Sequence, residues 1–252
     1  MTKDNEYILL KTTSPINMLN DENEIIYSGT CFFIKDDSNR WFFVTNIHII
    51  EKSNCYSLYF SFYNKENKCS HHEFRFYDLE DVTMHPNYDL CIVEFTKHYN
   101  DLMKEKDKPI LAYIPIKSIE KSFDYFKRIE DVYMVGYPCC LINLRDNLPI
   151  VRKGITGTGM CDKIKDNDTF IIDIPVYGGS SGSPVYYITE DDKVKLVGIV
   201  TGKYNEKNYL QIIEDGKITQ SKTEYIKVPN GLGYVIKSNI ILELVNMVPN
   251  CQ

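Results

Sequence analysis

Gly178-Gly179-Ser180-Ser181-Gly182-Ser183-Pro184 forms a serine turn flanked by glycines, and it leads directly into the apolar residues 185–187. A serine hydroxyl is a weak nucleophile unless a base removes its proton and N–H donors await the developing oxyanion. Glycine at 179 lets the backbone adopt a positive φ and turn its N–H inward, and glycine at 182 removes a Cβ from the path of a substrate. The turn therefore offers a nucleophile, Ser181, and an oxyanion site, and the base must come from elsewhere.

His48 is the histidine whose position suits a general base. The chain has five histidines, and this one follows the apolar run 41–45, which is typical of a core strand. It therefore lies where a strand ends and a side chain can face a cleft. The alternative interpretation, a hydrogen-bonded core histidine, is the commoner one for His48 taken alone.

Asp89 is the carboxylate that suits such a base. A histidine base needs an acid that fixes its tautomer and stabilises the imidazolium. Asp89 comes directly before the apolar run 90–95, which is an unusual place for an unpaired charge. A loop aspartate that ends a turn is the alternative interpretation.

Short runs rich in β-branched and aromatic residues recur along the chain, separated by polar turn clusters. The predicted strands are 7–10, 30–34, 41–45, 56–62, 74–77, 90–95, 132–136, 155–159, 169–174, 185–188, 194–200 and 233–236. This spacing predicts an all-β barrel or sandwich. Residues 115–131 have partial helical periodicity and suit a connector, 203–224 read as a polar loop, and 238–247 predict an amphipathic helix with Ser238 as its N-cap.

Composition excludes several classes of protein. The chain has 252 residues, 43% of them apolar, and its 35 acidic against 29 basic residues give a net charge of -6. We therefore expect no nucleic-acid partner and no membrane association. The N-terminus lacks the pattern of a signal peptide, which predicts a cytoplasmic protein. Several of the eight cysteines lie in apolar runs without a Cys-x-x-Cys pair, so we expect reduced thiols and no metal site.

The order His48, Asp89, Ser181 and the sequences around these residues resemble the trypsin-like, chymotrypsin-fold serine proteases, and most closely their HtrA-like bacterial branch. The resemblance spans residues 25 to 245 and covers the protease domain alone. The segments that carry it are Val44 to Ile50, His85 to Val93, Val135 to Pro138, Gly179 to Pro184 and Gly231 to Ile236.

The resemblance implies two packed six-stranded antiparallel β-barrels with a short C-terminal helix. Residues 1–114 form the barrel that carries His48 and Asp89, and residues 115–131 form the connector. Residues 132–252 form the barrel that carries Ser181 and end in the helix of residues 238–247. The triad is then assembled from both barrels.

The activity that the resemblance implies is that of a serine endopeptidase, which hydrolyses peptide bonds through an acyl-enzyme and needs no cofactor. Its partners are a protein or peptide substrate and, in addition, a regulatory protein. The N–H groups of Gly179 and Ser181 hold the oxyanion. The predicted substrate-binding residues are Val176, Tyr177, Thr201, Gly202 and Lys203. No acid is found at the base of the specificity pocket, which favours a small or medium apolar residue before the cut.

Two departures from the family pattern bear on activation. Ser180 stands where zymogen enzymes of this fold carry an aspartate that pairs with a newly cut N-terminus, so that ion pair cannot form. Ser183 replaces a glycine and places a hydroxyl beside the nucleophile. An alternative function stays open, namely a protease-fold binding or regulatory module that is inactive, or active only when a partner remodels its loops. A third is an effector that cuts one designated partner.

Overall fold

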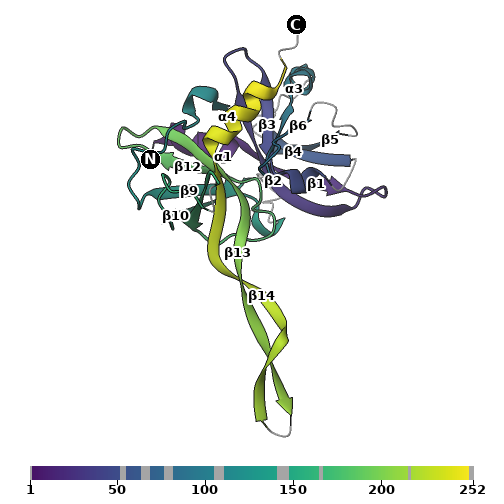
Figure 1. Ribbon diagram of the computed structural model, residues 1–252. Helices are drawn as coiled ribbons and strands as arrows, with labels where there is room; N and C mark the ends of the chain where they lie inside the picture. The colour runs from purple at the N-terminus through teal and green to yellow at the C-terminus, as the bar shows by residue number, and fades with distance from the viewer. Residues whose placement is uncertain are drawn as a thin grey trace.

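The computed structural model describes residues 2–51, 55–63, 69–76, 82–104, 111–140, 148–164, 167–214 and 217–249 (Figure 1). The strands of the first half are β1 (Thr13–Leu19), β2 (Ile25–Lys35), β3 (Trp41–Thr45), β4 (Cys55–Tyr63), β5 (Cys69–Phe76), β6 (Val82–Met84), β7 (Cys91–Glu94) and β8 (Ile114–Pro115). Those of the second half are β9 (Asp131–Gly136), β10 (Ile150–Thr156), β11 (Thr169–Asp173), β12 (Pro184–Ile188), β13 (Val194–Glu214) and β14 (Lys217–Lys237). The helices are α1 (Lys3–Lys11), α2 (Ile47–Ile50), α3 (Thr96–Leu102) and α4 (Ser238–Met247).

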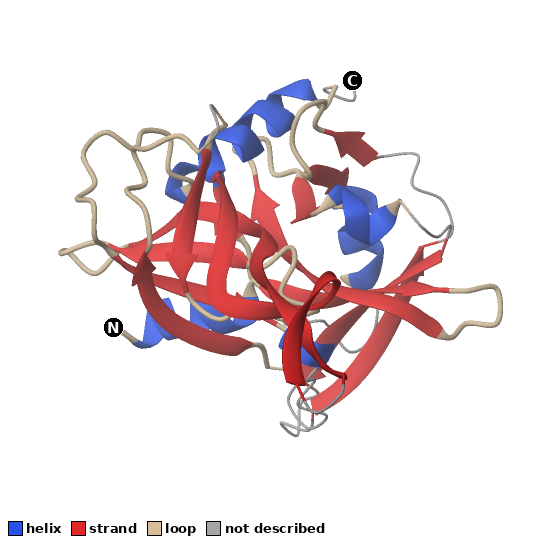
Figure 2. Cartoon of the chain, turned by 60° about the horizontal axis from the view of Figure 1, so that its bottom comes forward, coloured by secondary structure: helices blue, strands red, loops and turns tan. Residues whose placement is uncertain are grey.

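The expected all-β fold with a short C-terminal helix is confirmed. The second half is a closed barrel of six strands in the order β10, β11, β14, β13, β12, β9. The first half is an eight-stranded sheet with the path β5, β4, β1, β2, β3, β7, β6, and β8 pairs with β2. Figure 2 shows the strands gathered at the centre with the helices around them.

The two halves meet through an apolar layer to which both contribute. Phe32 of β2 and Phe42 of β3 pack in this layer with Tyr186 of β12, Ile199 of β13 and the apolar face of α4. The alternate residues of β2 and β3 face the interior of the first half instead. Both faces of these strands are therefore buried, which is why their sequences read as continuous apolar runs.

The prediction of a strand at residues 7–10 is wrong, because these residues belong to α1. The helix begins after Thr2, whose side chain accepts a hydrogen bond from Asn5 N (3.4 Å). Leu9 is 1% exposed and lies in the layer between the halves. A run of four apolar residues is too short to distinguish a strand from one buried face of a helix.

The prediction of a polar loop at 203–224 is also wrong. β13 and β14 continue past the barrel as a two-stranded ribbon that pairs as far as Glu214 and Lys217. We call residues 202–234 the arm. Residues 232–234 at its base still pair with β11 of the barrel, and Figure 1 shows the rest extending away from the molecule. Polar and aromatic residues are frequent among its described side chains, and even Ile226 is 55% exposed, because no core lies beside the ribbon.

Smaller corrections concern four other segments. The strand expected at 155–159 is β10, which lies several residues earlier, and β1 was not predicted. The connector 115–131 contains a single 3-10 turn at Ile116–Ser118, and its spaced phenylalanines bury against the barrel core. The helix at 238–247 is confirmed, but Ser238 is its first helical residue and its hydroxyl donates to Glu120 O (2.7 Å).

Replacing Leu9 with alanine tests whether α1 is part of the core. Leu9→Ala removes buried methyl groups from the layer between the halves, so the free energy of unfolding should fall by about 2–4 kcal/mol. Tyr7→Ala on the same helix is the control, since Tyr7 is 49% exposed. Urea unfolding measures both, and equal values for the two variants would contradict this assignment of the core.

Candidate active site

His48 and Asp89 form the best-defined polar contact of the candidate site. β3 ends at Thr45, and the short helix α2 then carries His48. A hydrogen bond of 2.5 Å joins His48 Nδ1 and Asp89 Oδ2, and His48 N donates to Asp89 Oδ1 (3.0 Å). Asn46, which precedes the helix, donates through Nδ2 to Asp89 O (2.7 Å). Backbone and side chain together therefore position the imidazole on the carboxylate.

The surroundings of Asp89 favour its ionised form. Burial by itself raises the pKa of this carboxyl, but hydrogen bonds from the side chain and backbone of His48, its nearby charge, and the Thr201 hydroxyl outweigh burial and lower the pKa below 3.8. Thr201 Oγ1 donates to Asp89 Oδ2 at 2.9 Å. Thr201 was predicted to bind substrate, and the structure shows that its hydroxyl also contacts the acid.

The serine turn is held against strand β2 of the other half. Thr30 N donates to Ser181 O (2.8 Å), and Thr30 Oγ1 donates to Gly179 O (2.9 Å). Gly179 and Gly182 have φ of 85° and 84°. A Cβ at residue 182 would lie 1.9 Å from Thr30 O, so glycine there is required by contact with β2 and not by the path of a substrate.

All the polar groups of Thr30 are hydrogen-bonded, two of them to the serine turn. It is fully buried, and its Oγ1 also accepts from Tyr137 N (3.1 Å), while its carbonyl accepts from Thr45 Oγ1 (2.9 Å). The sequence analysis missed Thr30. A lone threonine in an apolar strand was the available signal, and it does not distinguish a functional contact from a structural one.

Ser180 orders the turn from inside. It is fully buried, its Oγ accepts from Tyr177 N (3.3 Å), and its carbonyl accepts from Ser183 N (3.1 Å). These local hydrogen bonds occupy the position at which zymogen relatives have an acid. The turn is thus shaped without an ion pair to a cleaved N-terminus.

Three polar groups of the serine turn have no hydrogen-bond partner among the described residues. Within the described ranges, the N–H groups of Gly179 and Ser181 donate to no protein acceptor. Nor does a hydrogen bond in those ranges join the Ser181 hydroxyl to the His48 imidazole. His48 and Asp89 are therefore paired with each other, whereas no hydrogen bond joins either of them to the Ser181 hydroxyl within the described ranges.

The other predicted substrate-binding residues differ in exposure: Tyr177 is exposed, whereas Val176 is buried. Tyr177 is 41% exposed, and the Arg152 guanidinium lies 5.0 Å from the centre of its ring. Gly202 and Lys203 follow Thr201 on β13, and a Cβ at residue 202 would meet no atom within 4 Å. Val176 is 3% exposed and packs in the core of the second barrel, so its side chain belongs mainly to the core.

The structure describes four of the cysteines and, in part of the chain, the side chains that could bind a metal. No group of three or more His, Cys, Asp or Glu side chains there could hold a metal ion. Cys31, Cys91, Cys139 and Cys161 are free thiols, and burial raises the pKa of Cys31 and Cys91.

No helix among the described residues is long and apolar enough to cross a membrane.

The lowered pKa of Asp89 predicts a dependence of stability on pH. Because its folded pKa lies below the ordinary value of 3.8, ionised Asp89 adds stability above that pH, and the contribution is lost as the pH falls through the folded pKa. The stability of the wild-type chain relative to Asp89→Asn should therefore be constant well above pH 3.8 and decrease progressively as the pH falls through 3.8 toward the folded pKa. Urea unfolding across this range measures the difference. Asp21→Asn, in an exposed turn, is the control, and an equal pH dependence for both variants would contradict the assignment.

Two solved protease structures are similar to the chain in fold. The chain resembles the solved MamO protease domain from Magnetospirillum magneticum, with a TM-score of 0.52 and 12% identity over 94% of this chain and 97% of that one. It also resembles the protease Anisep from Arthrobacter nicotinovorans, with a TM-score of 0.56 and 12% identity over 96% of each chain. At this identity the likeness shows the fold alone.

Sequence comparison identifies the family. No curated protein sequence matches the chain significantly. A family model for the trypsin-like peptidase domain matches residues 29–199, which include His48, Asp89 and Ser181. The closer likeness to the HtrA-like branch stays a prediction. Because the family model covers well over half of the sequence, the chain belongs to the trypsin-like peptidase domain family.

Proposed function

We propose that the protein is a serine endopeptidase in which Ser181 is the nucleophile, His48 the general base and Asp89 the acid that positions His48. The observation that carries this proposal is the 2.5 Å contact between His48 Nδ1 and Asp89 Oδ2, supported by the Thr201 hydroxyl. Because Nδ1 of His48 is engaged by Asp89, Nε2 of His48 is the nitrogen that can accept a proton. Membership of a peptidase family supports the reaction class.

The residues have defined roles in the proposed reaction. Ser181 Oγ attacks the scissile carbonyl carbon while His48 Nε2 takes its proton, and Asp89 stays ionised and stabilises the imidazolium. The N–H groups of Gly179 and Ser181 hold the oxyanion, and each good donor of this kind lowers the activation barrier by roughly 3–4 kcal/mol. His48 then gives the proton to the leaving amine, and water attacks the acyl-enzyme with His48 again as base.

The proposed substrate is an extended segment of a protein or peptide. Thr201, Gly202 and Lys203 would pair with its backbone by strand addition. Tyr177, exposed beside the serine turn, would contact the residue before the cut, with a preference for a small or medium apolar side chain. A regulatory protein partner and a cytoplasmic location belong to the same proposal.

A binding or regulatory module with the fold of a protease is the second candidate. The absence of a hydrogen bond between Ser181 and His48 within the described residues favours it. In that case a partner would have to complete the site before any peptide is cut. Labelling of the serine distinguishes the two candidates, because labelling of the free chain requires an activated hydroxyl.

Ser181→Ala tests the assignment of the nucleophile. We expect it to abolish both fluorophosphonate labelling and peptide cleavage, because no other side chain takes the place of Oγ. Ser183→Ala is the matched control. It removes a buried neighbouring hydroxyl that has no hydrogen-bond partner among the described residues, and it should label normally. Labelling that survives in Ser181→Ala, or is lost in Ser183→Ala, would contradict the assignment.

Thr30→Val tests whether Thr30 positions the oxyanion donors. Valine keeps the shape but removes the hydroxyl that donates to Gly179 O. We expect kcat to fall about 10–100-fold with KM within about twofold, because the oxyanion forms only in the transition state. Thr30→Ser, which keeps the hydroxyl, should restore most of kcat. An equal loss in both variants, or a change confined to KM, would show that Thr30 acts only on packing or binding.

A further inference from the structure

The arm starts at the candidate active site. Thr201, the β13 residue whose hydroxyl contacts Asp89, lies just before the arm. β12 pairs antiparallel with one edge of β13 as far as Ile199, and β14 occupies the other edge. On the edge that β12 occupies, the backbone of Val200 pairs with Gly182 and Ser183 of the serine turn, and from Thr201 outward the edge is left unpaired among the described residues. This edge therefore leads outward from the serine turn along the arm.

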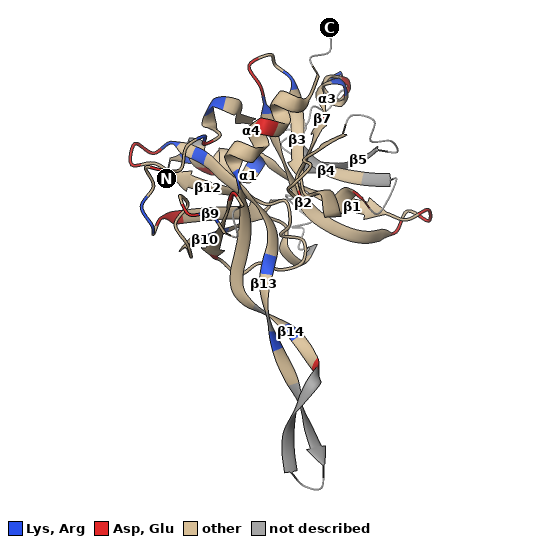
Figure 3. Cartoon of the chain, viewed as in Figure 1, with Lys and Arg blue, Asp and Glu red and all other residues tan. Residues whose placement is uncertain are grey.

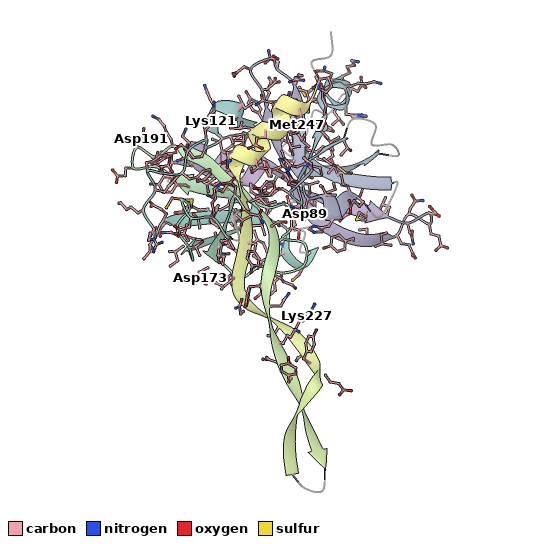
Figure 4. All side chains as sticks on the ribbon, in the orientation of Figure 1. Asp89, Lys121, Asp173, Asp191, Lys227 and Met247 are labelled. Atoms are coloured by element: carbon pink, nitrogen blue, oxygen red, sulfur yellow. The ribbon has the colours of Figure 1, made fainter. Side chains whose placement is uncertain are left out.

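The two faces of the arm differ in chemistry. Lys207 lies opposite Lys227, and Tyr209 opposite Tyr225, and the alternation of strand residues places these four on one face. Asn208 and Ile226 lie opposite each other on the other face. We call the first set the basic-aromatic face. Lys227 is labelled on the arm in Figure 4, and the basic positions are blue in Figure 3.

The side chains of the basic-aromatic face contact one another, and its two lysines keep their positive charge. Lys207 Nζ lies 4.5 Å from the centre of the Tyr225 ring, and the Tyr209 and Tyr225 rings are 5.6 Å apart. Both tyrosines are 37% exposed. In the part of the chain that is described, neither lysine forms a salt bridge. The face thus presents two cations and two aromatic rings to an outside partner.

Lys207 and Lys227 place two like charges directly opposite each other on the arm. Lysines directly opposite each other destabilise a strand pair, and a two-stranded ribbon without a core is marginal by itself. The chain as a whole has a net charge of -6, so two opposed lysines on one face run against its overall composition. An acidic ligand on this face would remove the repulsion and stabilise the ribbon.

We propose that the arm is a docking surface for an acidic, extended segment of the protein substrate, N-terminal to the bond that is cut. The inference rests on the proposed endopeptidase function. A peptide that adds to the free edge in the antiparallel sense of β12 runs from the far end of the arm toward Ser181. Its N-terminal residues then lie along the arm, and acidic side chains at alternate positions reach Lys207 and Lys227. Continuity with the substrate strand favours a polypeptide over a nucleic acid.

A binding measurement tests the proposal on the full-length Ser181→Ala chain. The probe is a fluorescein-labelled ten-residue peptide in which glutamate alternates with threonine, matching the two-residue period of a strand. We expect it to bind, to weaken with added salt, and to lose about tenfold in affinity when both lysines become glutamine in Lys207→Gln/Lys227→Gln. The same peptide with glutamine in place of glutamate should bind weakly.

The control variant is Asn208→Glu/Ile226→Glu. It changes the net charge by the same amount as the lysine variant, but on the other face of the arm, and it should bind the peptide like the parent chain. Circular dichroism confirms that both variants keep the ribbon. Equal losses in the two variants, or no loss in either, would overturn the proposal. So would binding of a ten-residue oligothymidylate that depends on the lysines while the peptide does not bind.

A second readout separates this inference from the proposed function. In the active chain, an alternating-glutamate extension on the N-terminal side of a cleaved peptide should raise kcat/KM, and the same extension on the C-terminal side should not. If short peptides are cut but neither extension matters, the docking proposal fails alone. If Ser181 proves unreactive while the Ser181→Ala chain binds the peptide through the lysines, the endopeptidase assignment fails and the docking face stands.

Discussion

The contact between Thr30 and the serine turn is the constraint on which the rest of the site depends. Strand β2 belongs to the first half and the turn to the second, so the shape of the nucleophile loop is set across the junction. Thr30 donates to Gly179 O and Ser181 O at once, which fixes the peptide groups that follow these two residues and so restrains the backbone of the turn on both sides of Ser180. The approach is so close that Gly182 admits no side chain. In the proposed reaction, the N–H groups of Gly179 and Ser181 would therefore lie on a backbone that is ordered before substrate arrives, as electrostatic catalysis requires.

The acid and the base depend on the same junction. His48 and Asp89 come from the first half, yet Thr201 of β13 completes the hydrogen bonding of the carboxylate. Figure 4 places Asp89 near the middle of the molecule, between the halves. Their apolar layer, with Phe32 and Tyr186 fully buried, keeps the two halves in one arrangement. A stable interface is thus a condition for the chemistry as well as for the fold.

The arm extends the substrate strand beyond the barrel. The barrel needs β13 and β14 only as far as their pairing with β12 and β11, so their length is not explained by the core. A ribbon that starts beside Asp89 and carries lysines and tyrosines on one face gives the proposed peptidase a means of choosing partners at a distance from the cut. Its selectivity then comes from the length of chain it contacts as well as from the residue before the bond.

The sequence by itself determined the family, the β architecture, the C-terminal helix and the three residues of the proposed triad, because each lies in a local pattern with a recognisable chemistry. It placed residues 7–10 in a strand and 203–224 in a loop, since short apolar runs and polar stretches do not define a backbone conformation. Only the tertiary structure decided that Thr30 orients the serine turn and that Thr201 contacts Asp89. These hydrogen bonds join residues more than a hundred positions apart, and no local pattern encodes which distant groups the packing of the two halves brings together.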